Sequence, residues 1–388
     1  MKEIYKIYFA FYMVICLVFA NINMVWGKDM IKEDVPNITS KAAVVVEQTT
    51  GRVLFEKNSK EKLKIASTTK VLTAIVAVEN ANIEDKVKIS KKAALTGGSR
   101  VGLTAGSEVT LESLLYGLLL KSGNDCAVAI AEYVGGDTET FVKMMNSKAY
   151  EIGAKDTHCT NPHGLDTDEN YSTALDIVKI TCYAKNISVI SKIMNTESIN
   201  VNLGKTQKYL ANTNRLLVSY KYCDGGKTGY TAIAGRCLVA TATKEDLSIV
   251  AVVLGANTTD IRFNECKKIL EYGFNNYKMV NVKDLINWYI AIPVVKGIKD
   301  MYIDKFEANI KLPLKEGEKE EIYLYENLVP ILNAPVNKGK YIGEIGLCIG
   351  NEKLFFKEIY TKESILKKNV KDYFILGIKS MFQNEYIS

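Results

Sequence analysis

The chain has 388 residues, of which 47% are hydrophobic and 24% are charged, a balance typical of a globular protein with two or three domains. The net charge of +6 is too small to indicate a nucleic-acid-binding protein, and the sequence lacks basic tracts interleaved with aromatic residues. A mildly basic exterior suits an anionic cell envelope or membrane surface.

The N-terminal segment has the pattern of a secretory signal peptide. Two lysines precede an apolar stretch over residues 7–20, and small residues stand at Ala20 and Gly27. We therefore predict a signal peptide over residues 1–27, cleaved after Gly27 in preference to Ala20. An extension of the apolar stretch to Trp26 leaves an uncleaved anchor as the alternative. In either case the protein is expected to be exported.

The cysteines and histidines argue against a disulfide framework and against a metal site. No Cys-x-x-Cys motif is present, and the number of cysteines after the signal is odd. Most of them are expected to be small buried apolar residues. The two histidines, His158 and His163, are too few for a zinc site, and we expect no cofactor. The cysteines in question are Cys126, Cys159, Cys182, Cys223, Cys237, Cys266 and Cys348.

From residue 28 to residue 275 the pattern predicts an α+β domain. A β-hairpin signature covers residues 42–47 and 53–56, and two further strands are expected at 236–243 and 247–254. This order predicts one antiparallel sheet that takes its first two strands from the N-terminus and is covered by helices. Helices are expected to begin near Ser67 and to cover about 111–119, 125–135, 139–152, 172–185 and 264–273.

Two smaller regions follow. Residues 276–362 hold short alternating stretches, at 306–312, 321–325 and 341–347, and predict a small all-β domain. Residues 363–388 predict a C-terminal amphipathic helix, and residues 361–388 carry five lysines against three acids. Such a helix can associate with a membrane interface, and a helix docked on its own domain is the alternative. Its apolar face would carry Leu366, Val370, Tyr373, Phe374, Gly377 and Met381.

The first chemical motif is Ser67-x-x-Lys70, at the start of the apolar run 71–78. A helix there would bring the two side chains to one face. Burial would lower the pKa of the lysine, so that a neutral amine could take the proton of the hydroxyl. The spacing alone is weak, because Ser59/Lys62 and Ser364/Lys367 share it.

Two further motifs follow in order, Ser122-Gly123-Asn124 and Lys227-Thr228-Gly229. Each alone also fits a helix–loop–helix break or a turn into a strand. Together with the first motif they resemble the triplet of motifs found in penicillin-binding proteins and class A β-lactamases.

Acyl transfer assigns a task to each catalytic position. Ser67 is the expected nucleophile that becomes the acyl-enzyme, and Lys70 is its base. Ser122 can relay the proton to the departing nitrogen. The backbone N–H groups of Ser67 and Tyr230 are the expected oxyanion hole.

The remaining motif residues are expected to bind the substrate. Asn124 can hold a substrate amide, Lys227 adds positive charge, and Thr228 can donate a hydrogen bond to a carboxylate. Gly229 allows close backbone packing beside the strand.

Further segments extend the resemblance over nearly the whole chain. Residues 50–58, 161–166, 224–231 and 334–339 are similar to the low-molecular-mass penicillin-binding proteins of the serine D-Ala-D-Ala carboxypeptidase family, peptidase family S11. The resemblance implies a transpeptidase-like catalytic domain, a small β-domain and a C-terminal membrane anchor. It also implies removal of the terminal D-alanine from peptidoglycan stem peptides in cell-wall biogenesis, and acylation by β-lactams such as penicillin.

The resemblance also implies a place for the protein and for two further residues. The protein would lie on the outer face of the cytoplasmic membrane or in the cell wall. Arg262 corresponds to the family's second carboxylate-binding cation, and His163 would lie near the site or be an ordinary loop histidine. Two positions depart from the family pattern: Tyr230 stands where some relatives carry histidine, and Ile65 where many carry proline.

Three rival functions share parts of this signature. A β-lactamase would need a carboxylate that activates the deacylating water, and Glu197, in a Glu-x-x-Asn pattern, is too close to the third motif. A non-hydrolytic penicillin-sensing or wall-binding module would keep Ser67 but release no D-alanine. A transpeptidase would differ only in using an amine as the acceptor, and the sequence does not separate it from a carboxypeptidase.

Overall fold

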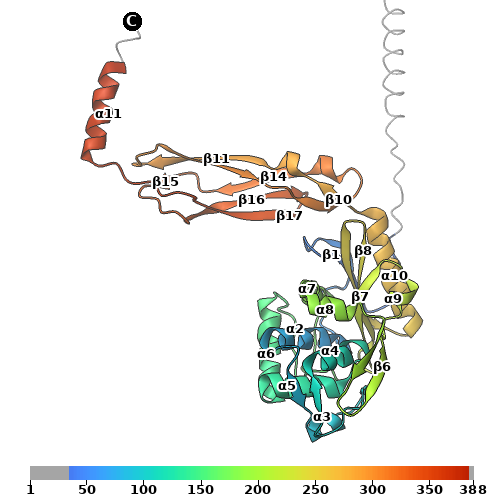
Figure 1. Cartoon of the computed structure of the whole chain (residues 1–388). Helices are drawn as coiled ribbons and strands as arrows, with labels where there is room; N and C mark the ends of the chain where they lie inside the picture. Colours follow the sequence, from blue (N-terminus) through green and yellow to red (C-terminus); the bar gives the residue numbers. More distant parts are fainter. Residues whose placement is uncertain (1–34, 384–388) are drawn as a thin grey trace, which may run out of the picture. The chain divides into compact units, whose positions relative to one another are not determined.

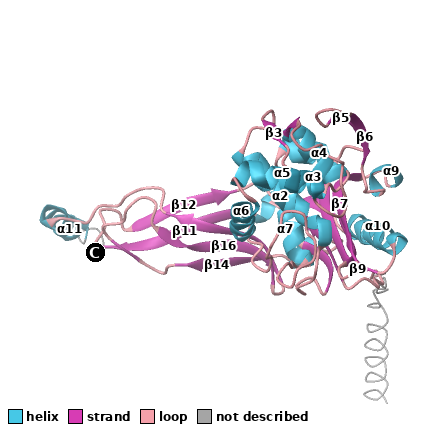
Figure 2. Cartoon of the chain, turned by 90° about the horizontal axis from the view of Figure 1, so that it is seen from below, coloured by secondary structure: helices cyan, strands magenta, loops and turns pink. Residues whose placement is uncertain are grey.

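The computed structural model describes residues 35–383, so the predicted signal peptide lies outside the described residues. Residues 38–276 form helices around a five-stranded antiparallel sheet (Figures 1 and 2). This arrangement confirms the predicted α+β fold and the contribution of the N-terminal hairpin to the sheet. In sheet order the strands are β2 (Val53–Lys57), β1 (Ala42–Glu47), β9 (Leu247–Ala256), β8 (Gly235–Lys244) and β7 (Cys223–Thr231).

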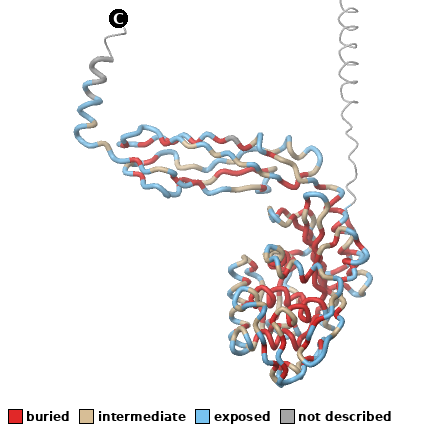
Figure 3. Tube along the Cα trace, in the orientation of Figure 1, coloured by how far each residue is buried: buried red, intermediate tan, exposed pale blue. Residues whose placement is uncertain are grey.

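The sheet is covered on both faces. Alternate residues of β1 belong to different hydrophobic clusters: Ala42 and Val44 face one, and Ala43 and Val45 face the other. A strand buried on both faces is apolar throughout, which explains the unbroken run 42–46. The first face packs against α7 (Ala174–Lys185) and the second against α10 (Thr259–Asn276). The buried segments are drawn in red in Figure 3.

The helix behind the first motif is α2 (Lys70–Asn80), and all of its residues from Lys70 to Ala77 are buried. It packs against α4, α5, α6 and α7. A helix that is apolar nearly all round requires this central position. The other helices of the region are α3 (Lys91–Leu95), α4 (Leu111–Leu120), α5 (Asn124–Gly135), α6 (Thr138–Glu151), α8 (Ser188–Met194) and α9 (Leu216–Ser219).

Several local expectations were wrong or incomplete. Ser67 lies in a 3₁₀ turn, η1 (Ala66–Thr69), that precedes α2 instead of in the first turn of the helix. The sequence-based prediction also missed α8, which has only seven residues, and two antiparallel ladders, whose strands are short. The ladders join β3 (Lys86–Lys88) to β4 (Glu108–Thr110) and β5 (Ser198–Asn202) to β6 (Gln207–Ala211).

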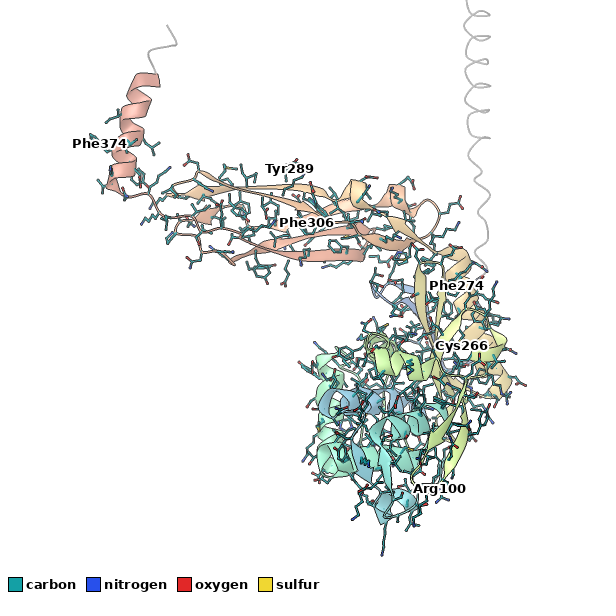
Figure 4. The ribbon with its side chains drawn as sticks, in the orientation of Figure 1. Arg100, Cys266, Phe274, Tyr289, Phe306 and Phe374 are labelled. Atoms are coloured by element: carbon teal, nitrogen blue, oxygen red, sulfur yellow. The ribbon has the colours of Figure 1, made fainter. Side chains whose placement is uncertain are left out.

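Residues 278–360 form short strands around a separate hydrophobic cluster that includes Trp288 and Tyr302. Phe306 stacks against Phe355 at 6.4 Å between ring centroids, and Figure 4 labels Phe306. The stretch 306–312 is not one strand as predicted, because β12 ends at Glu307 and β13 begins at Lys311. The strands are β10 (Lys278–Asn281), β11 (Asn287–Val295), β12 (Met301–Glu307), β13 (Lys311–Leu314), β14 (Tyr323–Leu328), β15 (Leu332–Asn333), β16 (Tyr341–Ile349) and β17 (Glu352–Tyr360).

The C-terminal helix, α11 (Val370–Gln383), begins later than residue 363. Residues before it belong to the β region, because Ile365 is buried and forms a bridge with Val336. Among residues 35–383, no helix combines the length and the apolar character that crossing a bilayer requires. The seven cysteines after the predicted signal have free thiols, and six of them are buried.

Candidate active site

The nucleophile turn is held in an unusual backbone conformation. Ala66 has a φ of 48°, in the left-handed region that few non-glycine residues adopt. Strand β7 runs beside this turn, and a Cβ atom on Gly229 would approach the backbone nitrogen of Ser67 to 3.0 Å. A glycine is therefore needed at this position for β7 to lie beside the backbone of Ser67.

The amine of Lys70 is the centre of the site. The side chain is fully buried, and its Nζ lies 2.7 Å from Ser67 Oγ, 2.8 Å from Asn124 Oδ1 and 2.7 Å from the carbonyl oxygen of His163. Burial, reinforced by the nearby charge of Lys227, holds the pKa of Lys70 well below its ordinary value. The amine is thus biased toward its neutral form.

These contacts orient a neutral amine. Such an amine has two N–H groups and one lone pair, and the oxygens of Asn124 and His163 can only accept hydrogen bonds. When both N–H groups are donated to these oxygens, the lone pair is left for the hydroxyl of Ser67. The arrangement suits removal of the Ser67 proton.

The loop over residues 161–165 presents the His163 carbonyl to Lys70. Asn161 Oδ1 accepts hydrogen bonds from the backbone N–H groups of His163 and Gly164, which closes a tight turn. Gly164 has a φ of 82°, and a Cβ atom there would overlap the carbonyl oxygen of Ala66. The loop therefore packs directly against the nucleophile turn.

The imidazole of His163 is placed differently from its carbonyl group. Nδ1 accepts a hydrogen bond from the backbone N–H of Leu165 at 3.3 Å. Burial and the neighbouring Lys70 lower the pKa of His163 to about 4. The ring is therefore neutral near pH 7, and the contact of this residue with the catalytic amine is through its backbone.

The second motif lies between α4 and α5. Ser122 is buried and has a φ of 62°, and Asn124 is the first residue of α5. Asn124 Nδ2 donates to the carbonyl oxygen of Gly97 at 2.8 Å, so its amide joins Lys70 to the loop after α3. The Ser122 hydroxyl makes no hydrogen bond to the residues that the structure describes, and its link to the site is its position two residues before Asn124.

The neighbouring Asp125 fixes the loop that borders the site. Its carboxylate accepts hydrogen bonds from the backbone N–H groups of Val101, Gly102 and Leu103. The exposed Arg100, labelled in Figure 4, belongs to this loop. The start of α5 thus holds the catalytic amine through Asn124 and the loop through Asp125.

The third motif is on β7, the edge strand of the sheet. Lys227 is fully buried, and its Nζ donates to the carbonyl oxygen of Thr228 at 2.7 Å. Burial, with a contribution from Arg262, lowers the pKa of Lys227 to about 7. The hydroxyl of Thr228 bonds to that of Thr213 at 2.7 Å.

Arg262 lies beside this strand. It projects from α10, is only 8% exposed, and its NH1 is 3.4 Å from the carbonyl oxygen of Gly229. Its Nε is buried and has no hydrogen-bond partner among the described residues. A buried guanidinium with a free donor is suited to an anionic ligand.

The sequence-predicted residues therefore form two connected groups. Ser67, Lys70 and Asn124 are joined by hydrogen bonds, and His163 joins them through its carbonyl group. Gly229 links Arg262 to the nucleophile turn. Sequence reasoning missed the roles of Thr213, Asp125 and Asn161, and only the Asn161-Pro-His-Gly turn pattern gave a signal. Tyr230 is 58% exposed on the strand, with the guanidinium of Arg236 at 4.7 Å from its ring.

Comparison with known proteins agrees with this geometry. The sequence model of the D-alanyl-D-alanine carboxypeptidase family, Peptidase_S11, matches residues 29–258. The chain belongs to this family. It is a serine carboxypeptidase of the penicillin-binding protein group, which confirms the family, fold class and enzyme class that the three motifs predict.

Two curated relatives and one solved structure match most of the chain. D-alanyl-D-alanine carboxypeptidase DacF of Bacillus subtilis is 36% identical over 84% of this chain and 86% of its own length. The DacC carboxypeptidase of Escherichia coli is 31% identical over 86% of each chain. Penicillin-binding protein 5 of Haemophilus influenzae has a TM-score of 0.75 and 28% identity, covering 86% of this chain and 99% of its own.

The contributions of the His163 imidazole and of the His163 backbone carbonyl can be tested separately. We expect His163→Ala to keep the rate constant of acylation by a labelled penicillin within about five-fold of wild type, because the backbone carbonyl is retained. Gly164→Ala should lower it by about 100-fold or more, because the new Cβ would displace the carbonyl from Lys70.

Gly153→Ala is the matched control, because Gly153 has a φ of 85° but no atom within 4 Å of an added Cβ. It should reproduce the backbone strain without the loss of acylation. Equal losses in His163→Ala and Gly164→Ala, with unchanged thermal unfolding, would assign the function to the imidazole instead.

Proposed function

We propose that this carboxypeptidase removes the terminal D-alanine of peptidoglycan stem peptides through an acyl-enzyme on Ser67. The observation that carries the proposal is the buried amine of Lys70. Its two N–H groups can be donated to the oxygens of Asn124 and His163, which leaves its lone pair for the Ser67 hydroxyl. Peptides that end in D-Ala-D-Ala and β-lactams are the ligands that the family supports.

The proposed reaction begins with transfer of the Ser67 proton to Lys70. Ser67 Oγ attacks the carbonyl carbon of the penultimate D-alanine, and the N–H groups of Ser67 and Tyr230 stabilise the oxyanion. Lys70 then returns this proton through Ser122 to the departing nitrogen as the C–N bond breaks, so that D-alanine leaves and Lys70 is neutral again. Water attacks the ester while Lys70 takes its proton, and return of that proton to Ser67 Oγ releases the shortened peptide.

The proposed substrate contacts involve β7 and the neighbouring Arg262. Thr228, Lys227 and Arg262 would bind the terminal carboxylate, since all three can donate hydrogen bonds and two carry positive charge. The free Nε of Arg262 supports this assignment. Asn124 would hold a substrate amide with its remaining N–H.

One comparison supports a second function, in which an amine takes the place of water as the acceptor of the acyl group. A DD-transpeptidase of Streptomyces K15, solved as a variant, is 32% identical with a TM-score of 0.59, and it covers 62% of this chain. An amine that replaces water in the second step would give transpeptidation. The mass of the product formed in the presence of glycine or a D-amino acid distinguishes the two outcomes.

We also propose the division of the chain that its composition suggests: a catalytic domain over 28–275, a β-domain over 276–362, and a C-terminal segment that associates with the outer face of the cytoplasmic membrane. The support for membrane association is the exposure of large apolar side chains on α11. Val370 is 86% exposed and Phe374, labelled in Figure 4, is 69% exposed.

Wild-type protein should release D-alanine from diacetyl-L-Lys-D-Ala-D-Ala and bind labelled penicillin covalently. Ser67→Ala should lower D-alanine release by about 1,000-fold or more and abolish labelling, because Ser67 Oγ is the hydroxyl that lies 2.7 Å from the Lys70 amine and forms the acyl-enzyme. Ser364→Ala, in another Ser-x-x-Lys spacing, is the control and should match wild type. Penicillin labelling without any D-alanine release would contradict the proposed activity.

The pH dependence of substrate binding should follow Lys227. With a pKa of about 7, its charge is present below pH 7 and is lost above it. We therefore expect KM for a carboxylate-ending peptide to rise as the pH increases from 6 to 9. Lys227→Arg, which stays charged, should show a flat KM over the same range. A wild-type KM that is constant from pH 6 to pH 9 would rule out this role.

Truncation after Asn369 tests membrane association and keeps Ile365 in the β region. We expect the truncated protein to move from the membrane fraction to the soluble fraction with unchanged D-alanine release. In the full chain, Phe374→Asp should weaken vesicle binding, whereas Val218→Asp, at an exposed apolar residue on α9, should not. Equal partition of truncated and full-length protein would show that α11 is not an anchor.

A further inference from the structure

A pocket of about 280 Å³ lies where the tip of the β7–β8 hairpin meets the segment before the nucleophile turn. Ile233 and Ala234 contribute the hairpin side, and Lys62 and Lys64 contribute the other side. Lys41, which directly precedes β1, adds a third lysine, and Asp168 and Tyr171 also line the pocket. None of these residues belongs to the three motifs.

The position of the pocket follows from the two proposed oxyanion donors. Lys64 precedes Ser67 by three residues, and Ile233 follows Tyr230 by three residues. Three residues span at most about 10–11 Å. Both backbone segments that form the oxyanion hole therefore continue into this pocket, which lies within about 11 Å of the hole along either segment.

The charge of the pocket is only partly neutralised by its neighbours. The lining carries three lysines against one aspartate. Lys64 Nζ donates to the backbone carbonyl groups of Thr167 and Asp168, which hold the ammonium in place but leave its charge. Lys62 Nζ forms an ion pair with Asp156 Oδ1 at 3.1 Å. The Nζ of Lys41 has no hydrogen bond or ion pair within residues 35–383.

We propose that this pocket is a subsite for a carboxylate of the stem peptide, located upstream of the scissile bond. The proposal rests on the proposed function, because the donor peptide must lie along β7. An acidic residue stands two positions before the penultimate D-alanine in an L-Ala-γ-D-Glu-L-Lys-D-Ala-D-Ala peptide. Its free α-carboxylate is the group that the lysines would bind.

The register of an added strand agrees with this assignment. β7 is an edge strand, so a peptide can pair with its free side, antiparallel, by backbone hydrogen bonds. With the terminal carboxylate at Thr228 and the scissile carbonyl at Tyr230, upstream residues pass Thr231 and reach the hairpin tip. Each residue advances about 3.3 Å, so the glutamate lies roughly 7–10 Å upstream, at Ile233.

Three peptides test the subsite in the full-length protein: diacetyl-L-Lys-D-Ala-D-Ala, L-Ala-γ-D-Glu-L-Lys-D-Ala-D-Ala, and the second peptide with its glutamate α-carboxylate amidated. Their affinities are measured by calorimetric titration into Ser67→Ala protein, which cannot form the acyl-enzyme. We expect the acidic peptide to bind about three- to five-fold more tightly than the amidated one, as for a partly exposed ion pair.

Adding Lys41→Met should bring that ratio close to one, and Lys41→Glu should invert it, while the affinity for the diacetyl peptide stays unchanged. Lys91→Met, at an exposed lysine on α3, is the control and should keep the wild-type ratio. Equal binding of the acidic and amidated peptides, or an unchanged ratio in both Lys41 variants, overturns the subsite. Failure of the proposed function would give a different result. Wild-type protein would then release no D-alanine from any of the three peptides.

Discussion

The site depends on burying one amine without giving it a carboxylate partner. Lys70 has no exposed surface and no carboxylate among the hydrogen-bond partners of its Nζ, so the cost of its charge is not offset by an ion pair. The protein instead supplies two neutral acceptors, an amide oxygen and a backbone carbonyl oxygen. A carboxylate at either place would stabilise the ammonium form and remove the base. The choice of neutral partners is therefore a condition for the chemistry.

The backbone around the amine shows what this arrangement requires. Ala66 and Ser122 both have positive φ values, and both belong to segments that border Lys70. Such conformations are unfavourable for non-glycine residues and persist where the surrounding packing fixes them. Here the fixing elements are the fully buried helix α2, the tight 161–165 turn and the start of α5. The rigid parts of the fold thus maintain the conformations that the loops would not adopt alone.

Sequence reasoning reached the parts of the site that are made by side chains in short patterns. The burial of α2 could be predicted from its continuous apolar run, and the Ser67–Lys70 pair from the spacing on one face. The His163 carbonyl could not, because a backbone acceptor leaves no mark on residue identity. Thr213 was missed for another reason, since a pair of threonines such as Thr213 and Thr228 carries no motif.

The amide of Asn124 connects the base to substrate binding through its limited capacity. An amide has two N–H donors and one acceptor oxygen. The oxygen is occupied by Lys70 and one N–H by the carbonyl of Gly97, so one donor remains for a substrate. The amide cannot rotate by 180° without placing its NH₂ against the amine of Lys70. The same hydrogen bond that orients the base therefore fixes the direction of the free donor, and a substrate carbonyl can be received only on that side.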